Sequence, residues 1–265
     1  MSNTNITPAT IGHGVRRLCI AVDLERYSQR ADSDQVEAQR AMSALLQAAG
    51  QHGALERAQW LIQPQGDGEL ALLPPGIDEA YVISSLMHHV RAGLHKYNQR
   101  VRDNGRLRMR IAVHEGVTYV ADSGFAGDAI NTVCRLRDAR ESKEALSTTE
   151  SDLVLIASAR IFHDVIRGSD GYDLPSAEFR ETEIVMADKG FRAQAFIYSC
   201  GAAGGPEDQG TPRAAPPGER APAGGATFNF HGRADVGDIA GRDMYKGSEP
   251  SARDVGTPVY RVRDE

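Results

Sequence analysis

From about residue 15 to residue 200 the chain alternates between strand-like and helix-like spacing of its apolar residues, in an order that restricts the folds open to it. Short apolar runs indicate strands, and apolar residues that recur every three or four positions indicate helices. The patterns predict a strand, a helix, a hairpin, a helix and a strand over residues 17–23, 33–50, 59–73, 78–103 and 108–114. This β-α-β-β-α-β order predicts a ferredoxin-like α/β sandwich, with helices packed over a mixed or antiparallel sheet.

The second half of this region continues in the same way. A helix, a strand, another helix and a closing antiparallel pair of strands are predicted over residues 129–139, 153–157, 159–167, 182–186 and 192–199. Residues 15–200 therefore have the length and the element content of one domain.

Composition changes abruptly after Cys200. Residues 201–226 are mostly Gly, Ala and Pro, so this segment cannot bury enough apolar surface to offset its ordering entropy. We predict a disordered linker there, and flexible ends at residues 1–14 and 248–265. Residues 227–247 regain aromatic residues and alternation, which is typical of a short β-prone segment.

Charge and cysteine content exclude several classes of protein. A net charge of −6 and a pI of about 5.8 argue against a nucleic-acid-coating protein, because phosphate binding needs clustered Lys and Arg. Cys19, Cys134 and Cys200 are far apart and lack metal-ligand spacing, so we expect reduced thiols in a cytoplasmic protein. No stretch approaches the roughly 18–20 apolar residues of a membrane span. We therefore expect neither nucleic acid nor membrane as a partner.

Two carboxylates stand where predicted strand ends meet. Asp23 ends the first strand, and Asp67 occupies the hairpin turn between Gly66 and Gly68. In a split β-α-β-β arrangement the first strand lies beside the hairpin, so the two side chains can converge. A Mg²⁺ or Mn²⁺ ion would remove their repulsion and share its remaining positions with phosphates and water. Taken alone, a Gly-Asp-Gly sequence is more often only a turn.

A second polar group lies on the helix predicted at residues 129–139. Asn131 and Arg135 are four residues apart and therefore project from one helix face. An amide and a guanidinium suit a sugar oxygen and a phosphoryl group that gains negative charge in its transition state. The alternative is an ordinary solvated helix face. His114, on an alternating strand, is interpreted as a structural residue.

These residues together resemble the class III nucleotidyl cyclases, the family of adenylate and guanylate cyclase catalytic domains. The family's D-x-x-x-aromatic-[ST] pattern is matched by Asp23, Tyr27 and Ser28, and its Gly-Asp hairpin is matched at residues 66–67. Its R-x-x-x-H-x-G strand is matched at residues 110–116.

Two further patterns extend the resemblance to the end of the domain. The helix G-[DN]-x-x-N-x-x-x-R-[LM] is matched at residues 127–136, and a Lys that precedes a glycine is matched by Lys189. The matches occur in the family's order within residues 15–200. They imply a cyclase fold with extra helices and a terminal hairpin.

The resemblance implies a nucleoside triphosphate site at the interface of a homodimer. Asp23 and Asp67 of one subunit would hold two Mg²⁺ or Mn²⁺ ions per site, and the helix that carries Asn131 and Arg135 would come from the other. Asn131 would orient the ribose, Arg135 would stabilise the pentacovalent phosphorus, and Lys189 would bind the terminal phosphates.

Two substrate-binding positions depart from the family pattern. Gln63 stands where adenylate cyclases have a base-selecting Lys, and Gly124 replaces the Asp or Thr that partners it. The base is therefore not predicted. The segment between Gly116 and Gly127 is short, which implies a reduced dimerisation arm.

The segment at residues 227–247 resembles bacterial amyloid-signalling motifs, which recruit a partner protein by homotypic stacking. The resemblance implies a protein partner for this segment. The alternative is an unstructured tail whose alternation is accidental.

Two functions follow from these residues. The first is a two-metal cyclase that converts a nucleoside triphosphate to a cyclic nucleotide and pyrophosphate, as a signalling effector. The second is a catalytically degenerate cyclase fold that senses a nucleotide or dimerises and signals through its tail. Retention of both carboxylates and of Asn131, Arg135 and Lys189 favours the enzyme, whereas the lost base-selecting residues favour the binding module.

Overall fold

The computed structural model of the protein describes residues 13–169, 172 and 174–200. The predicted linker at residues 201–226 and the predicted interaction motif at residues 227–247 lie outside the described residues.

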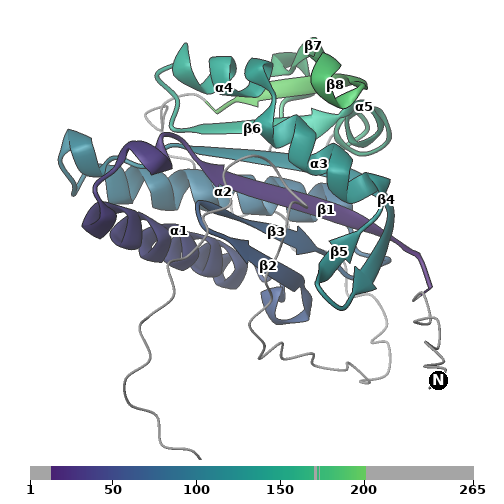
Figure 1. Ribbon diagram of the computed structural model, residues 1–265, viewed down its shortest axis with the longest axis horizontal. Coiled ribbons are helices and arrows are strands. Elements are labelled where there is room, and N and C mark those ends of the chain that lie inside the picture. The colour runs from purple at the N-terminus through teal and green to yellow at the C-terminus, as the bar shows by residue number, and fades with distance from the viewer. Residues whose placement is uncertain (1–12, 170–171, 173, 201–265) are drawn as a thin grey trace, which may run out of the picture.

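One eight-stranded mixed sheet organises the domain (Figure 1). The strand order is β2-β3-β1-β4-β6-β8-β7, and β5 pairs with β4 beside this path. Only β4 and β6 are parallel neighbours among the described strands; the other pairs are antiparallel. The strands are β1 (Val15–Leu24), β2 (Leu61–Gln65), β3 (Gly68–Leu72), β4 (Met109–Ala121), β5 (Gly124–Ala126), β6 (Leu153–Ser158), β7 (Arg180–Met186) and β8 (Phe191–Ser199).

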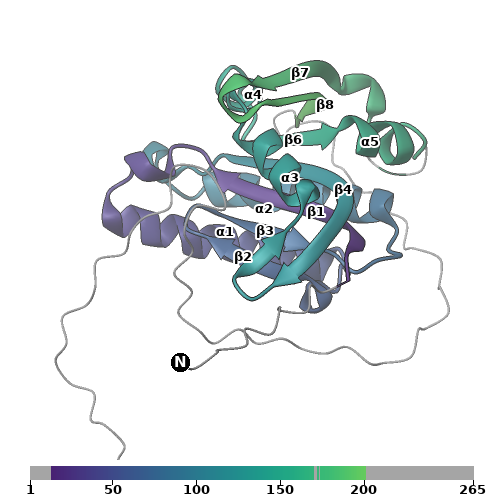
Figure 2. The same ribbon diagram turned by 45° about the vertical axis from the view of Figure 1, so that its right-hand side comes forward.

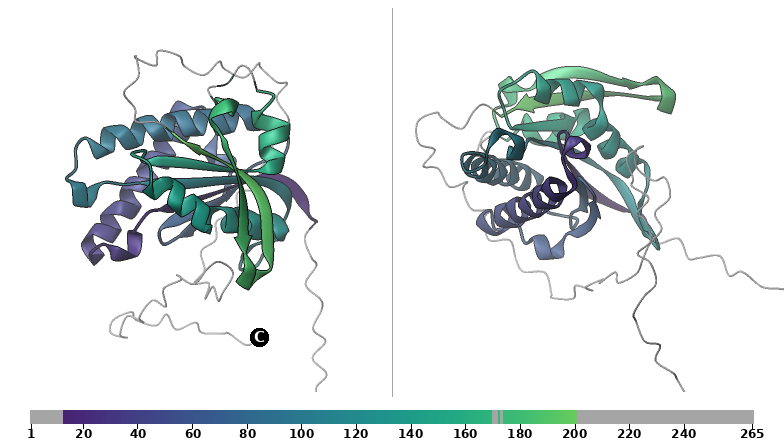
Figure 3. Two further views of the ribbon diagram at one scale, coloured as in Figure 1. Left: turned by 90° about the horizontal axis from the view of Figure 1, so that it is seen from above. Right: turned by 60° about the vertical axis from the view of Figure 1, so that its left-hand side comes forward.

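Helices cover both faces of the sheet (Figures 2 and 3). The α helices are α1 (Asp32–His52), α2 (Glu79–Asn98), α3 (Asp128–Asp138), α4 (Arg140–Ser147) and the short α5 (Ala159–Ile161). Because successive strand residues point to opposite faces, β1 contributes to two cores. Its Leu18 and Ile20 pack with α1 and α2, and its Cys19 and Ala21 pack with α3 and α4. The predicted ferredoxin-like α/β fold class, with extra helices and a terminal hairpin, is confirmed.

Three elements differ from the sequence-based prediction. β4 continues past His114 to Ala121, because its second half pairs with β1 and then folds back as β5. α4 was not predicted, since its few buried side chains include only two apolar ones, Ala145 and Leu146. The helix predicted at residues 159–167 is a single α turn followed by a π-helix at Phe162–Ile166.

Within the described part of the chain, no helix is both long enough and apolar enough to cross a membrane.

Candidate functional site

Asp23 lies at the end of β1, between two neighbouring strands. The register of β1 places it opposite Gly68 of β3 and opposite Arg110 of β4. This strand forms because it is apolar on both faces from Leu18 to Val22, and helices cover both faces. Asp23 itself keeps only 5% of its surface exposed. A carboxylate this deeply buried requires a charged or hydrogen-bonding partner.

The hairpin that carries Asp67 is joined to the end of β1 through the backbone. The Leu24 N–H donates to the carbonyl oxygen of Asp67 at 2.9 Å. Gly68 makes this close approach possible, because a Cβ there would lie 1.9 Å from the carbonyl oxygen of Val22. The structure therefore places the backbone of Asp67 beside the strand end that carries Asp23.

Helix α1 also holds the tip of this hairpin. Gln39 Nε2 donates to the carbonyl oxygen of Gly66 at 2.5 Å and to the hydroxyl oxygen of Tyr27 at 2.7 Å. Tyr27 begins the short 3-10 turn after β1, and Arg26 before it adopts a left-handed conformation with φ 55. The loop that follows Asp23 and the turn that contains Asp67 are thus fixed to the same helix.

Replacing Gly68 by alanine is expected to lower the free energy of unfolding by about 3 kcal/mol, because β1 and the hairpin must separate to admit a methyl group. Gly66→Ala is the matched control, since the nearest side-chain or backbone atom to a Cβ there is 4.0 Å away. Urea denaturation of the two variants measures the difference. Equal stabilities would contradict the close approach of the hairpin to β1.

The partner of Asp23 is Arg110. The Arg110 guanidinium donates to Asp23 Oδ2, and the two side chains keep 8% and 6% of their surface exposed. Burial lowers the pKa of Arg110 to about 10, with Asp138 opposing this effect. Arg110 therefore stays charged at neutral pH and neutralises Asp23. The pattern R-x-x-x-H-x-G contains Arg110, but only the strand register shows that it lies opposite Asp23.

Arg137 is a second buried cation on this side of the sheet. Its Nε donates to Asp138 at 2.8 Å, and its Nη1 donates to Gln65 Oε1. Burial opposes the charge on Arg137, but Asp138 raises the pKa of Arg137 above its usual value, and Asp67 contributes to this rise. Because Gln65 directly precedes the hairpin turn, Arg137 ties α3 to the hairpin that carries Asp67. Arg137 was not identified from the sequence, because the helix pattern G-[DN]-x-x-N-x-x-x-R-[LM] ends at residue 136 and includes only Arg135.

Asn131, Arg135 and Lys189 form a separate group around α3 and the β7–β8 turn. Asn131 is exposed, and the guanidinium carbon of the half-buried Arg135 lies 5.1 Å from the ring centroid of Phe191. Lys189 is exposed in the turn just before Phe191. Burial raises the pKa of Cys134, and Lys189 is one of the charges that oppose this rise.

Arg135 and Arg137 leave α3 in different directions. Residues two apart on an α-helix project in directions about 160° from each other. Arg137 turns toward the hairpin of its own chain, whereas Arg135 turns toward Phe191. Within one chain, Arg135 consequently does not face Asp67.

Gln63 and Gly124 lie against each other. A Cβ on Gly124 would stand 2.6 Å from Gln63 Oε1, and Gly124 has φ +128, which favours glycine. The two positions that depart from the family pattern thus form one small surface at β2 and β5, where Gln63 presents an amide.

His114 lies opposite Cys19, away from Asp23. Burial lowers the pKa of His114, with Glu115 opposing the shift. Its Nδ1 is buried and has no hydrogen-bond partner among the described residues. A neutral imidazole packed against the sheet agrees with the interpretation of His114 as structural.

The fold built from these elements is that of cyclase catalytic domains. The guanylyl cyclase Cya2 superposes with a TM-score of 0.50 at 14% identity, over 75% of this chain and 98% of that cyclase. An adenylate/guanylate cyclase/hydrolase from Silicibacter pomeroyi gives a TM-score of 0.49 at 18% identity, over 71% and 99% of the two chains. A bacterial light-regulated adenylyl cyclase gives 0.45 at 12% identity, over 69% and 90%.

The similarity is one of fold. No family model matches the sequence, and no curated protein matches it. The resemblance to class III cyclases expected from the sequence is confirmed at the level of the fold.

Proposed function

We propose that this chain is a nucleotidyl cyclase that converts a nucleoside triphosphate to a cyclic nucleotide monophosphate and pyrophosphate. The observation that carries this proposal is the junction of β1 with the β2–β3 hairpin, which holds Asp23 and Asp67 at adjoining backbone positions. The buried guanidinium groups of Arg110 and Arg137 lie on the same side of the sheet. Carboxylates suit divalent ions, and guanidinium groups suit phosphate oxygens.

The donor set fits Mg²⁺ or Mn²⁺ that binds together with its substrate. Among the described residues, no cluster of three or more His, Cys, Asp or Glu side chains could hold an ion unaided. Asp23 and Asp67 supply hard oxygen ligands, and phosphate oxygens and water would complete each coordination shell. Bound there, two ions would lower the pKa of the attacking hydroxyl and neutralise the triphosphate. Because Arg110 already neutralises Asp23, an ion without phosphates would bind weakly.

Residues of the chain account for the remaining steps. The ribose 3′ oxygen bonds to the α-phosphorus, the bond from that phosphorus to the bridging oxygen breaks, pyrophosphate leaves with that oxygen, and the hydroxyl proton passes to water. Arg135 would stabilise the negative charge on the pentacovalent phosphorus, and Asn131 would orient the ribose. Lys189 would hold the terminal phosphates. Gln63, beside Gly124, would face the base with an amide that both donates and accepts.

We propose that a complete site needs two copies of the chain. Arg135 and Asp67 do not face each other in one chain, so a second copy has to supply one of the two groups.

Incubation of the purified chain with each of the four nucleoside triphosphates tests the proposal. With Mn²⁺ or Mg²⁺, mass spectrometry should find at least one cyclic nucleotide and an equal amount of pyrophosphate, and a chelator should abolish both. Absence of cyclic product from all four substrates, with protein shown to be folded and dimeric, would refute it.

The Asp23–Arg110 pair favours a second candidate function, a module that binds a nucleotide or dimerises without catalysis. An internal cation that already neutralises a metal ligand stabilises a metal-free state. Saturable binding of a triphosphate without any product, in the same assay, would select this function.

A further inference from the structure

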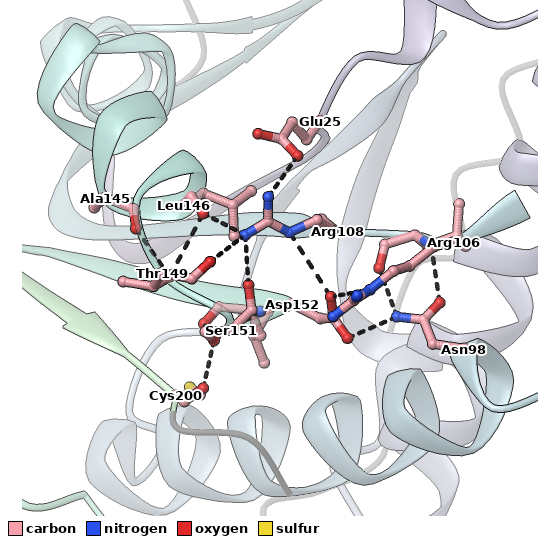
Figure 4. A network of polar contacts seen from close by, with 12 residues as sticks. Glu25, Asn98, Arg106, Arg108, Ala145, Leu146, Thr149, Ser151, Asp152 and Cys200 are labelled. Carbon is pink, nitrogen blue, oxygen red and sulfur yellow. Dashed lines mark hydrogen bonds and ion pairs between the residues drawn. The ribbon is translucent and has the colours of Figure 1, made fainter. Parts of the chain in front are cut away.

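A polar cavity of about 570 Å³ lies at the same end of the sheet as Asp23, on the face that α2 covers. Asp23 belongs to the face that α3 and α4 cover, and Arg108 of the cavity wall reaches the end of that helix layer at Leu146. The lining includes none of the candidate site residues Asp23, Asp67, Arg110 and Arg137. Its walls come from α2, from the segments before β4 and β6, and from Cys200 after β8. Figure 4 shows the polar wall that contains Arg106, Arg108 and Asp152. The volume is in the range typical of small-molecule sites.

Arg108 is a fixed part of this wall. It donates to Glu25 Oε2 at 3.0 Å and to the carbonyl oxygens of Thr149 and Ser151 at 2.9 and 2.8 Å, and it also donates to the carbonyl of Leu146 (Figure 4). These hydrogen bonds satisfy the terminal nitrogens of the Arg108 guanidinium within the chain. Arg108 therefore has a structural role in the cavity wall, and its charge is already paired without a ligand.

Asp152 is also satisfied within the chain. Arg106 Nε donates to its Oδ1 at 2.8 Å, and Asn98 Nδ2 donates to its Oδ2 at 2.9 Å (Figure 4). The carboxylate therefore does not present a free negative charge to the cavity.

Arg91 differs from these residues. Its Nε is buried and has no hydrogen-bond partner among the described residues. None of the ion pairs between described residues includes it. A buried donor without a partner costs stability, and an anion that accepts from it would remove that cost. His95, one helical turn later, lines the same cavity, and its Nε2 is hydrogen-bonded to Gln99 Nε2 at 2.8 Å.

The rest of the lining is one exposed carboxylate, Glu150, together with neutral and apolar residues. Leu94 and Leu153 are buried core residues that reach the cavity. Burial raises the pKa of the Cys200 thiol to about 12, so Cys200 adds no negative charge at neutral pH. The lining thus contains three arginines against two carboxylates, and the Nε of Arg91 lacks a hydrogen-bond partner beside an apolar wall.

We propose that this cavity binds a small organic anion, with its phosphate or carboxylate group at Arg91 and its apolar body against Leu94 and Leu153. The site does not depend on cyclase chemistry, because it shares no residue with the Asp23 and Asp67 edge.

Calorimetric titration of the full chain with phenyl phosphate and, separately, with phenylacetate tests the proposal. At least one of the two anions should bind saturably at one site per chain, and the preferred one identifies the acidic group. Arg91→Gln should weaken this binding at least about tenfold, through loss of a charge-assisted hydrogen bond. Arg91→Lys should give an intermediate affinity. Arg100→Gln changes an exposed arginine two residues beyond the end of the same helix, and this variant should bind normally.

Two further measurements locate the ligand. Methyl resonances of Leu94 and Leu153 in the unsubstituted chain should shift on titration, which holds whether or not Arg91→Gln folds. Asp67→Asn should bind the anion as tightly as the unsubstituted chain. Absence of saturable binding by both anions, unshifted leucine methyls, or binding that survives Arg91→Gln would overturn the proposal.

Discussion

Asp67→Asn should lower kcat for cyclic nucleotide formation by about a thousandfold or more and remove metal-dependent triphosphate binding. The amide keeps the size of the side chain but loses the charge that would hold a divalent ion, and ion-based charge stabilisation contributes several kcal/mol to such reactions. Asp67 lies half-buried in a turn, so the substitution should leave the fold intact. Steady-state kinetics with Mn²⁺ and calorimetry measure the two effects.

Asp122→Asn is the matched control, because Asp122 is exposed in the turn between β4 and β5. It should leave both measurements unchanged. If Asp67→Asn and Asp122→Asn bind the triphosphate equally strongly in the presence of metal, Asp67 is not a metal ligand.

Asp23 should behave differently from Asp67, because it is half of a buried ion pair. Asp23→Ala leaves Arg110 buried without its carboxylate, so it should remove activity and also about 3 kcal/mol of stability. Adding Arg110→Met should recover much of the stability without any activity. The stability of Asp23 variants therefore has to be measured before their lost activity is assigned to metal binding.

The second large effect concerns Arg135. Arg135→Ala should lower kcat by about a hundredfold or more and leave KM nearly unchanged, because an interaction made mainly with the transition state appears in kcat. Its contact with Phe191 is partly exposed, so its loss should cost only about 1 kcal/mol of stability. Steady-state kinetics separate kcat from KM.

Arg140→Ala provides the control, since Arg140 lies on the adjoining helix with 79% of its side chain exposed. If Arg135→Ala instead raises KM and leaves kcat unchanged, Arg135 binds the substrate in its ground state and does not stabilise the transition state.

The main elements of the fold could be predicted because they rest on local patterns. Residues 17–23 form a buried run, and Gly66-Asp67-Gly68 between apolar segments marks the hairpin. α4 escaped prediction because Ala145 and Leu146 alone carry too short a pattern to define a helix.

Some residues of the candidate site could be predicted from local sequence patterns, whereas their contacts with other strands and helices could not. Asp23, Asp67 and the pair Asn131 and Arg135 stand out by their places in local patterns. The pairing of Asp23 with Arg110 depends on the register between β1 and β4. These strands are far apart in the sequence, since β1 ends at Leu24 and β4 begins at Met109. Such a register is set by the packing of the whole sheet. The cavity at Arg91 likewise forms only when α2, β6 and Cys200 come together.

Mixing two inactive variants tests the central claim, that the carboxylate edge of one copy works with the α3 group of another. Asp67→Asn and Arg135→Ala should each be inactive as homodimers, whereas a mixed dimer carries one intact edge and one intact α3 group at a single site. Product formation should therefore return to about a quarter of the unsubstituted rate in an equal, randomly exchanged mixture, since half of the dimers are mixed and each has one working site of two. A mixture that stays inactive, with mixed dimers demonstrated by native mass spectrometry, would contradict a site shared between two chains.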